Sequence, residues 1–308
     1  MLTRPKVLCG MRRFVRRGVD RVLRGWGYER PPVKVLVDLS ELAMGPLEAV
    51  RRANGRRVIV SVPMDTLRTL APLGFPLGRN ATHPYVETAR QWLTGSHTTY
   101  FGSALCAYYD AIQPRNGAEL LGSGALFRGS RLERMTPIET AYPWHRAPGP
   151  SVEQYRRRWI HGDSKEHGVE RGRTLAWPIV GPISHEDGEH NFSRIVHLVE
   201  SVKDTGFDPN GRGTGHVTGT VLHDGSRLVV AVGGGQHRVA VLDALGYAAV
   251  PVLLHPRRLV SRTSVSEWPG VRSGAFSVEQ ALAVFDRLLG GGLPECVPEA
   301  WYGARPPT

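Results

Sequence analysis

The residues with the clearest chemical potential are Gly233 to Arg238, where three glycines are followed by glutamine, histidine and arginine. Glycines at a strand-to-helix turn let backbone N–H groups approach a ligand, and the start of a helix favours an anion. Arg238 can bind phosphate oxygens through two hydrogen bonds, and His237 can donate a hydrogen bond or a proton. The segment predicts a phosphate-binding loop, although three glycines before a helix also fit a purely structural turn.

The residues on either side predict the elements that position this loop. Leu228–Val232 is a short apolar run of strand length. After the loop, apolar residues recur at helical spacing up to Leu245, and Gly246 stands where a glycine commonly ends a helix. A second strand-like run covers Val250–Leu254. The predicted unit is therefore strand, glycine loop, helix and strand.

A resemblance to the ParB/sulfiredoxin superfamily is carried by Gly233 to Val252, which reads G-G-G-Q-H-R-V-A-V-L-D-A-L-G-Y-A-A-V-P-V. Members of that superfamily carry G-x-H-R or G-x-R-R at this turn, then a helix ending in L-G and a V-P-V strand. Phe192–Phe207 is similar to their upstream helix. The resemblance covers about residues 176–256. It implies an α+β fold of the ParB/sulfiredoxin-like type, a small mixed sheet with helices, that binds a nucleotide.

At two positions this chain has a different residue from the superfamily members of known activity. The serine kinases of the superfamily carry aspartate where this chain has Gly234, and sulfiredoxins carry their reactive cysteine where it has Gln236. Without a thiolate no covalent sulfur intermediate can form, so sulfiredoxin activity is not expected. Nucleotide binding is less affected by these departures than catalysis is.

An acidic cluster at residues 184–191 precedes a helix expected at Ser193–Thr205. In the ParB-like kinases an acidic residue of the corresponding loop is the general base toward the acceptor hydroxyl, and carboxylates there hold Mg²⁺. The resemblance implies Glu189 first and Glu186 second as the base, with Glu186 and Asp187 as metal ligands. From the residues alone, these acids equally favour a helix N-terminus, where negative charge is stabilising.

The nucleotide site implied by the resemblance combines both segments. The nucleotide would be ATP, or else ADP or CTP, accompanied by Mg²⁺. Arg194 is expected to reach the nucleotide phosphates, and His237 is expected to take part in catalysis as well as in binding. The full set of predicted binding residues is Gly233, Gly234, Gly235, Gln236, His237, Arg238 and Arg194.

Composition sets limits on partners and location. The formal net charge is +11, from 39 Lys and Arg against 28 Asp and Glu, which favours anionic partners. Arginine-rich usage is also common in GC-rich genomes. Cys9, Cys106 and Cys296 are widely separated and predict neither a disulfide framework nor a zinc site. Because no apolar run is long enough for a membrane span or a secretory signal, we expect a cytoplasmic protein.

The chain is divided by these patterns into four parts. Residues 1–30 hold a basic amphipathic helix at Met11–Tyr28, which either packs on the protein or makes a peripheral membrane contact. Residues 31–150 form an α/β region of unknown role, residues 151–292 the ParB/sulfiredoxin-like nucleotide-binding domain, and residues 293–308 a C-terminal tail. Whether residues 38–150 fold independently is left open.

The remaining expected elements lie on both sides of the glycine loop. A strand is expected at Arg56–Pro63, helices at Glu87–Leu93, Ser103–Ile112 and Ser277–Leu289, and an edge strand at Trp177–Ile183. Core packing is expected for the aromatic residues, namely Tyr100, Phe101, Tyr108, Tyr109, Tyr142 and Trp144.

Three functions follow from these patterns, in order of preference. The first is a nucleotide-dependent kinase that acts on a hydroxyl of a sugar or an amino-acid-like metabolite. A softer resemblance, to proteins of bacterial surface-polysaccharide gene clusters, implies that pathway context. The second is a non-catalytic nucleotide-binding or scaffold module. The third is a ParB-type DNA-binding protein, which is disfavoured because fewer than 60 residues follow Leu254 and they contain one convincing helix.

Overall fold

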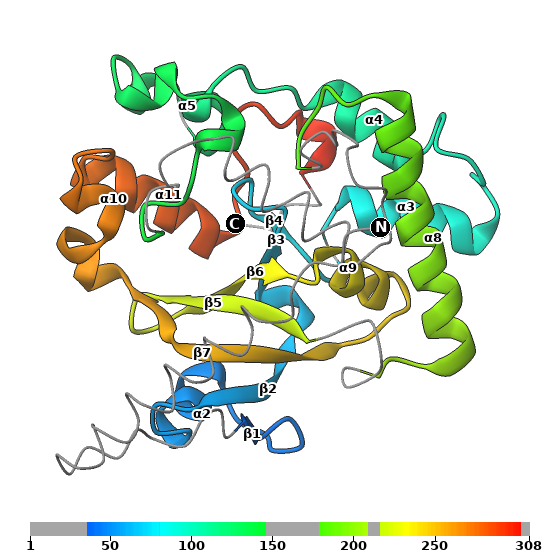
Figure 1. Cartoon of the computed structure of the whole chain (residues 1–308), viewed down its shortest axis with the longest axis horizontal. Coiled ribbons are helices and arrows are strands. Elements are labelled where there is room, and N and C mark those ends of the chain that lie inside the picture. Colours follow the sequence, from blue (N-terminus) through cyan, green and yellow to red (C-terminus); the bar gives the residue numbers. More distant parts are fainter. Residues whose placement is uncertain (1–35, 80, 123, 146–178, 209–215, 303–308) are drawn as a thin grey trace, which may run out of the picture.

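The computed structural model describes residues 36–79, 81–122, 124–145, 179–208 and 216–302, which form helices around one mixed sheet (Figure 1). The sheet has seven strands in the order β1-β2-β7-β5-β6-β3-β4. The strands are β1 Leu36–Asp38, β2 Arg57–Pro63, β3 Leu67–Thr69, β4 Phe75–Pro76, β5 Val217–His223, β6 Leu228–Gly234 and β7 Ala249–Ser261. The fold is therefore α+β, as predicted. The basic segment at residues 11–28 and the charged segment at residues 151–174 lie outside the described residues.

The helices cover both faces of this sheet. They are α2 Pro46–Arg52, α3 Pro84–Thr94, α4 Ala104–Ala111, α5 Gly117–Leu121, α6 Gly124–Phe127, α8 His185–Thr205, α9 Gln236–Ala244, α10 Pro269–Arg272 and α11 Val278–Gly290. Short 3₁₀ turns connect several of them. No helix in the described ranges has the length and apolar character that a membrane span requires.

Alternation along the strands explains why both faces are covered. In β6, Val230 and Val232 belong to the core formed with α3, α8 and α9, whereas Val229 and Ala231 belong to the core on the opposite face. Successive side chains of a strand point to opposite faces, so a strand that is apolar throughout needs a layer on each side. The second layer is α11 with an aromatic cluster that includes Trp144 and Trp268.

The two halves of the chain build this sheet together. β2 pairs antiparallel with β7 over Val58 to Pro63, and β3 pairs parallel with β6. Strands from residues 36–76 thus lie on both sides of the three strands from residues 217–261. The strands formed by residues 36–76 thus belong to the same sheet as those of residues 217–261, and they do not form a sheet of their own.

Most predicted elements are found close to their expected positions. The strand at 228–232, the helix after the glycine loop, the strand at 56–63 and the final helix all form, the last with Ser277 as its N-cap and Gly291 as its left-handed C-cap. The helices expected at 87–93 and 103–112 correspond to α3 and α4. β7 is longer than expected, because it continues through the basic residues 255–258.

Three expectations are wrong. Ile179–Ile183 forms a turn and irregular chain, not an edge strand. Phe101 is 77% exposed and contributes nothing to the core that the other five aromatic residues fill. The acidic cluster does not precede the helix but begins it, since α8 starts at His185. The reason is local: the Ser184 hydroxyl accepts from the Asp187 N–H at 3.1 Å and caps the helix.

Candidate phosphate-binding site

The turn between β6 and α9 is tightly built. Gly235 precedes the helix at φ 84° and ψ 28°, a left-handed conformation, and no side chain caps α9. A Cβ on Gly235 would lie 3.1 Å from Arg238 Nη1 and 3.2 Å from Val217 Cα, and one on Gly234 would lie 2.9 Å from Thr218 Oγ1. Gly235 therefore requires glycine, because its left-handed turn runs directly against the backbone at the start of β5, whereas a side chain at residue 234 would need the Thr218 side chain to move.

The three side chains after the glycines point in different directions. Gln236 Oε1 accepts from the N–H of Leu70 at 2.8 Å, which ties the start of α9 to the end of β3. The ring of His237 stacks on Tyr85, with the centroids 4.6 Å apart and the planes 10° from parallel. Arg238 turns back over its own loop, toward Gly235. A histidine and an arginine thus flank the helix start.

Tyr85 joins this histidine to the arginine predicted from the other segment. Burial raises the pKa of Tyr85 to about 12, while a hydrogen bond from Tyr109 and the charge of Arg194 act in the opposite direction. Tyr85 lies on α3, Arg194 on α8 and His237 on α9, and these three helices pack side by side (Figure 1). The structure therefore brings Arg194 and His237 to one buried tyrosine.

The position of Tyr85 is fixed by His83, the residue that caps α3. His83 Nδ1 accepts from the Tyr85 N–H at 3.1 Å and from the Val86 N–H at 3.4 Å, and His83 Nε2 lies 2.6 Å from Thr69 Oγ1 in β3. Complete burial lowers the pKa of His83 to about 3, so the ring is neutral. Because Nδ1 accepts, Nε2 carries the proton and donates to Thr69.

On the opposite side of the loop, Gly233 and Gln236 line a pocket of about 560 Å³ together with Arg257, Arg258 and His145. The pairing of β5 with β7 jumps from Gly219↔Leu254 to Val221↔Leu259, so residues 255–258 bulge out of the ladder there. Such bulges redirect side chains. Arg258 Nη1 lies 3.7 Å from where a Cβ of Gly233 would be.

His145 adds a neutral ring to this pocket. It is accessible from the pocket, yet the surrounding protein and, secondarily, the charge of Arg258 lower the pKa of His145 to about 4. A neutral imidazole can both donate and accept hydrogen bonds without adding charge. The two arginines therefore carry the positive charge on this side of the glycine loop.

The acidic cluster lies at the start of α8, on the side of α4. Asp187 is buried and accepts from the Ser184 hydroxyl at 2.9 Å, whereas Glu186 is exposed. Glu189 Oε1 lies 3.6 Å from His185 Nε2. Burial, Cys106, Asp110 and Glu189 together raise the pKa of Tyr100. Glu189 thus lies beside His185, its charge acts on Tyr100, and no interaction described here joins it to the glycine loop.

The predicted Mg²⁺ ligands do not fit a metal site formed by the protein. Glu186 and Asp187 are adjacent on a helix, where neighbouring side chains point in different directions. Within the ranges that the structure describes, no group of three or more His, Cys, Asp or Glu side chains could hold a metal ion.

Comparison of the chain with protein-family models, with curated proteins and with solved structures gives no match. The site is consequently defined by its own geometry. The sequence predicted Arg194 and the glycine loop as binding residues, and Tyr85 was not among the predicted residues. Arg257 and Arg258 were not among the predicted residues either.

Proposed function

We propose that the chain binds the phosphates of a nucleotide at the β6–α9 loop. The observation that carries this proposal is the uncapped start of α9 with His237 and Arg238 in its first turn, where His237 stacks on Tyr85, a residue on which the charge of Arg194 also acts. Arginine binds phosphate through paired hydrogen bonds, and a helix N-terminus adds partial positive charge. Gly235 supports it, because a left-handed glycine lets the backbone approach a ligand.

The order of the elements supports the same proposal. β6, the glycine turn, α9 and β7 follow one another as the ParB/sulfiredoxin resemblance implies, and α8, which carries Arg194, precedes them and packs against α3 and α9. A ParB/sulfiredoxin-like fold for this part of the chain is therefore part of the proposal. The nucleotide would be ATP, ADP or CTP.

Phosphoryl transfer to a small-molecule hydroxyl remains a prediction for this site. A sugar or an amino-acid-like acceptor would need a base beside the terminal phosphate, and Glu189 is the predicted residue. Glu189 lies 3.6 Å from His185, and its charge acts on Tyr100. The geometry consequently supports nucleotide binding better than it supports transfer, and no step of a transfer reaction is assigned to the chain's residues.

The proposal is tested by titration calorimetry of the full chain with ATP, ADP, CTP and GTP, each with Mg²⁺. We expect micromolar binding of at least one nucleotide, weakened at least tenfold by Arg238→Ala and by Arg194→Ala. Arg128→Ala is the matched control, because Arg128 is an exposed arginine distant from the loop in sequence. The proposal would be refuted if none of the four nucleotides bound. It would also be refuted if Arg238→Ala and Arg194→Ala bound nucleotide as tightly as the control Arg128→Ala.

Catalysis is tested separately in the same preparation. Hydrolysis of the bound nucleotide, or transfer of its terminal phosphate to a panel of sugars and amino acids, would be followed by phosphorus NMR. Turnover that Glu189→Ala removes while nucleotide binding is retained would support the kinase prediction. Binding without turnover would favour the non-catalytic module.

A further inference from the structure

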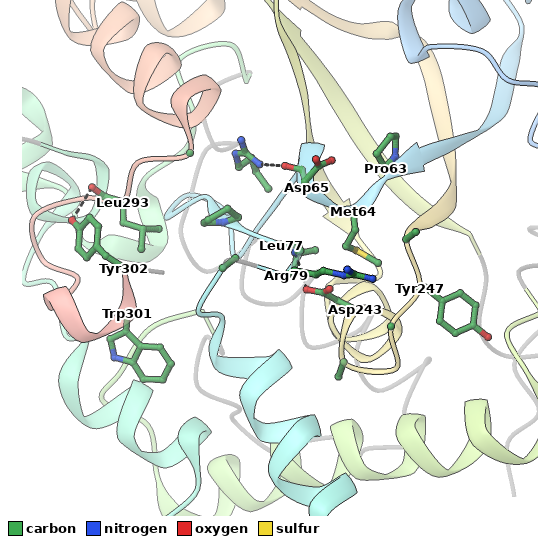
Figure 2. A pocket seen from close by; sticks show the side chains of 18 of the residues that line it. Pro63, Met64, Asp65, Leu77, Arg79, Asp243, Tyr247, Leu293, Trp301 and Tyr302 are labelled. Carbon is green, nitrogen blue, oxygen red and sulfur yellow. Dashed lines mark hydrogen bonds between the residues drawn. The ribbon is translucent and has the colours of Figure 1, made fainter. Parts of the chain in front are cut away.

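A second pocket, of about 970 Å³, shares no lining residue with the glycine loop. It lies between the C-terminal end of α9, the turn around β3 and β4, and the segment that follows α11 (Figure 2). Its size is within the range of small-molecule sites in proteins. Its walls combine buried groups of opposite charge with aromatic rings, and this combination decides what it can bind.

The buried positive charge is Arg68, whose side chain is 8% exposed. Its Nε donates to the carbonyl of Leu288 at 2.9 Å, and its Nη1 donates to the carbonyls of Asp65 and Leu67, each at 2.8 Å. Burial lowers the pKa of Arg68 to about 10. These partners are all neutral carbonyls, and among the described residues no carboxylate lies within ion-pair distance. The nearest negative charge that acts on the guanidinium is the carboxylate of Asp65, also in the pocket wall, and it makes no close ion pair with Arg68.

The remaining guanidinium nitrogen of Arg68, Nη2, lies at the pocket wall. Nη2 lies 3.3 Å from where a Cβ of Gly291 would be, and Gly291 lines the pocket. The hydrogen bond from Nε to an α11 carbonyl caps the end of that helix and explains the orientation of Nε. It neutralises no charge and leaves Nη2 out of the cap. A buried charge of this kind is stabilised by an anion that enters the pocket.

The buried negative charge is Asp243, in the last turn of α9 and also 8% exposed. Its Oδ2 accepts from the N–H of Gly78 at 2.9 Å, and no partner among the described residues occupies its Oδ1. Burial raises the pKa of Asp243, and the C-terminal end of a helix disfavours negative charge further. Burial and the helix C-terminus both disfavour the charged form of this carboxylate and so reduce the stability of the fold. Residues that reduce stability in this way are typical of functional sites.

The remaining wall residues show how a ligand would be arranged. Figure 2 shows Arg79 in the middle of the pocket near Asp243, with Tyr247 on one side and Trp301 and Tyr302 on the other. Arg79 is exposed and is a second group for an anion. The hydroxyl of Tyr302 donates to the carbonyl of Leu293 at 3.2 Å, which holds this ring in place.

We propose that this pocket binds a small zwitterion of the amino-acid type, with its ammonium group at Asp243 and its carboxylate at Arg68 and Arg79. The aromatic rings of Trp301 and Tyr302 would contact the apolar part of the ligand. A ligand with both charges satisfies both buried groups, whereas a simple anion or a simple cation would leave one of them unpaired. The site is independent of the proposed nucleotide site.

The test is a thermal-shift screen of the full chain against the twenty standard amino acids, followed by calorimetry of those that raise the melting temperature. For L-phenylalanine the single-charge analogues are phenethylamine and 3-phenylpropionate, and both should bind at least tenfold more weakly than the amino acid that carries both charges. The same pairing of analogues applies to whichever amino acid binds.

Two variants make the test specific. Asp243→Asn retains an oxygen for the Gly78 N–H but loses the charge, so it should weaken binding at least tenfold and raise the melting temperature of the free protein. The matched control is Asp204→Asn, an exposed aspartate in the last turn of α8. Arg79→Ala should also weaken binding at least tenfold, with Arg128→Ala as its control.

The two proposals give different results in these assays. Arg238→Ala should leave zwitterion binding unchanged, and Asp243→Asn should leave nucleotide binding unchanged. The proposal of a zwitterion site is overturned if no amino acid binds, if a single-charge analogue binds as tightly, or if Asp243→Asn and Arg79→Ala bind as the unmodified protein does.

Discussion

Replacing Gly235 by alanine tests the turn on which the proposed nucleotide site depends. An L-residue in the left-handed region costs about 1–2 kcal/mol, and the stiffer unfolded chain of the alanine variant returns about 0.4–1 kcal/mol. Gly246 has nearly the same φ, 85° against 84°, and open space around a Cβ. Gly246→Ala should therefore lower the free energy of unfolding by about 1 kcal/mol.

At Gly235 a second contribution is added. The new methyl group would lie 3.1 to 3.2 Å from Arg238 and Val217, closer than ordinary contact. Overcrowding of this kind costs about 1–3 kcal/mol, so Gly235→Ala should lower the free energy of unfolding by about 2–4 kcal/mol. Urea titrations of the two variants, followed by circular dichroism, measure the difference. Equal losses in both variants would show that the turn is not crowded and would refute the reasoning.

The remaining predictions concern buried groups elsewhere in the fold. His83 is neutral in the fold, with a pKa of about 3, but takes up a proton near pH 6.5 when unfolded. The free energy of unfolding should consequently fall by up to about 1.4 kcal/mol per pH unit between pH 6 and 4, and His83→Gln should reduce this slope in urea titrations. Gly188→Ala places a methyl group 2.2 Å from the ring of Tyr100 and should lower the free energy of unfolding by about 3 kcal/mol. Gly290→Ala, at an open helical position, should raise it by about 0.5–1 kcal/mol, and a loss of equal size in both glycine variants would contradict this explanation.

The elements around the glycine loop could be predicted because their signals are local. A β-branched run, three glycines and a helical apolar repeat fall within about thirty residues, and each signal is read without knowledge of the rest of the fold. The final helix was equally clear, since Ser277 and Gln280 form a capping box at its start. Local signals of this kind fix where elements begin and end.

The start of α8 was missed because its first turns carry no apolar repeat. The residues H-E-D-G-E-H-N at 185–191 give no periodic pattern, and the cap at Ser184 alone was outweighed by their polar composition. The displacement of Glu189 into a helix follows from this error. Glu189, which was expected in a loop, therefore lies on α8 beside His185, where its charge acts on Tyr100.

The site residues found only in the structure depend on pairing between distant segments. Tyr85 meets His237 because α3 and α9 pack on the same face of the sheet. Arg257 and Arg258 line the pocket beside Gly233 because residues 255–258 of β7 bulge out of the ladder with β5. Neither the pairing register nor a bulge leaves a signal in a single sequence, because both are set by contacts far along the chain.

The strand order also determines when this protein can fold during synthesis. β2 and β3 emerge from the ribosome first, yet their partners in the sheet are β7 and β6, which lie more than 150 residues further along the chain. A nascent chain that ends before residue 217 lacks β5, β6 and β7, so the early strands can form only the β1–β2 and β3–β4 pairs of the described sheet. The edge of β2 that pairs with β7 in the folded sheet therefore lacks its partner through most of translation. This makes it the segment on which a chaperone that holds extended apolar chains would act.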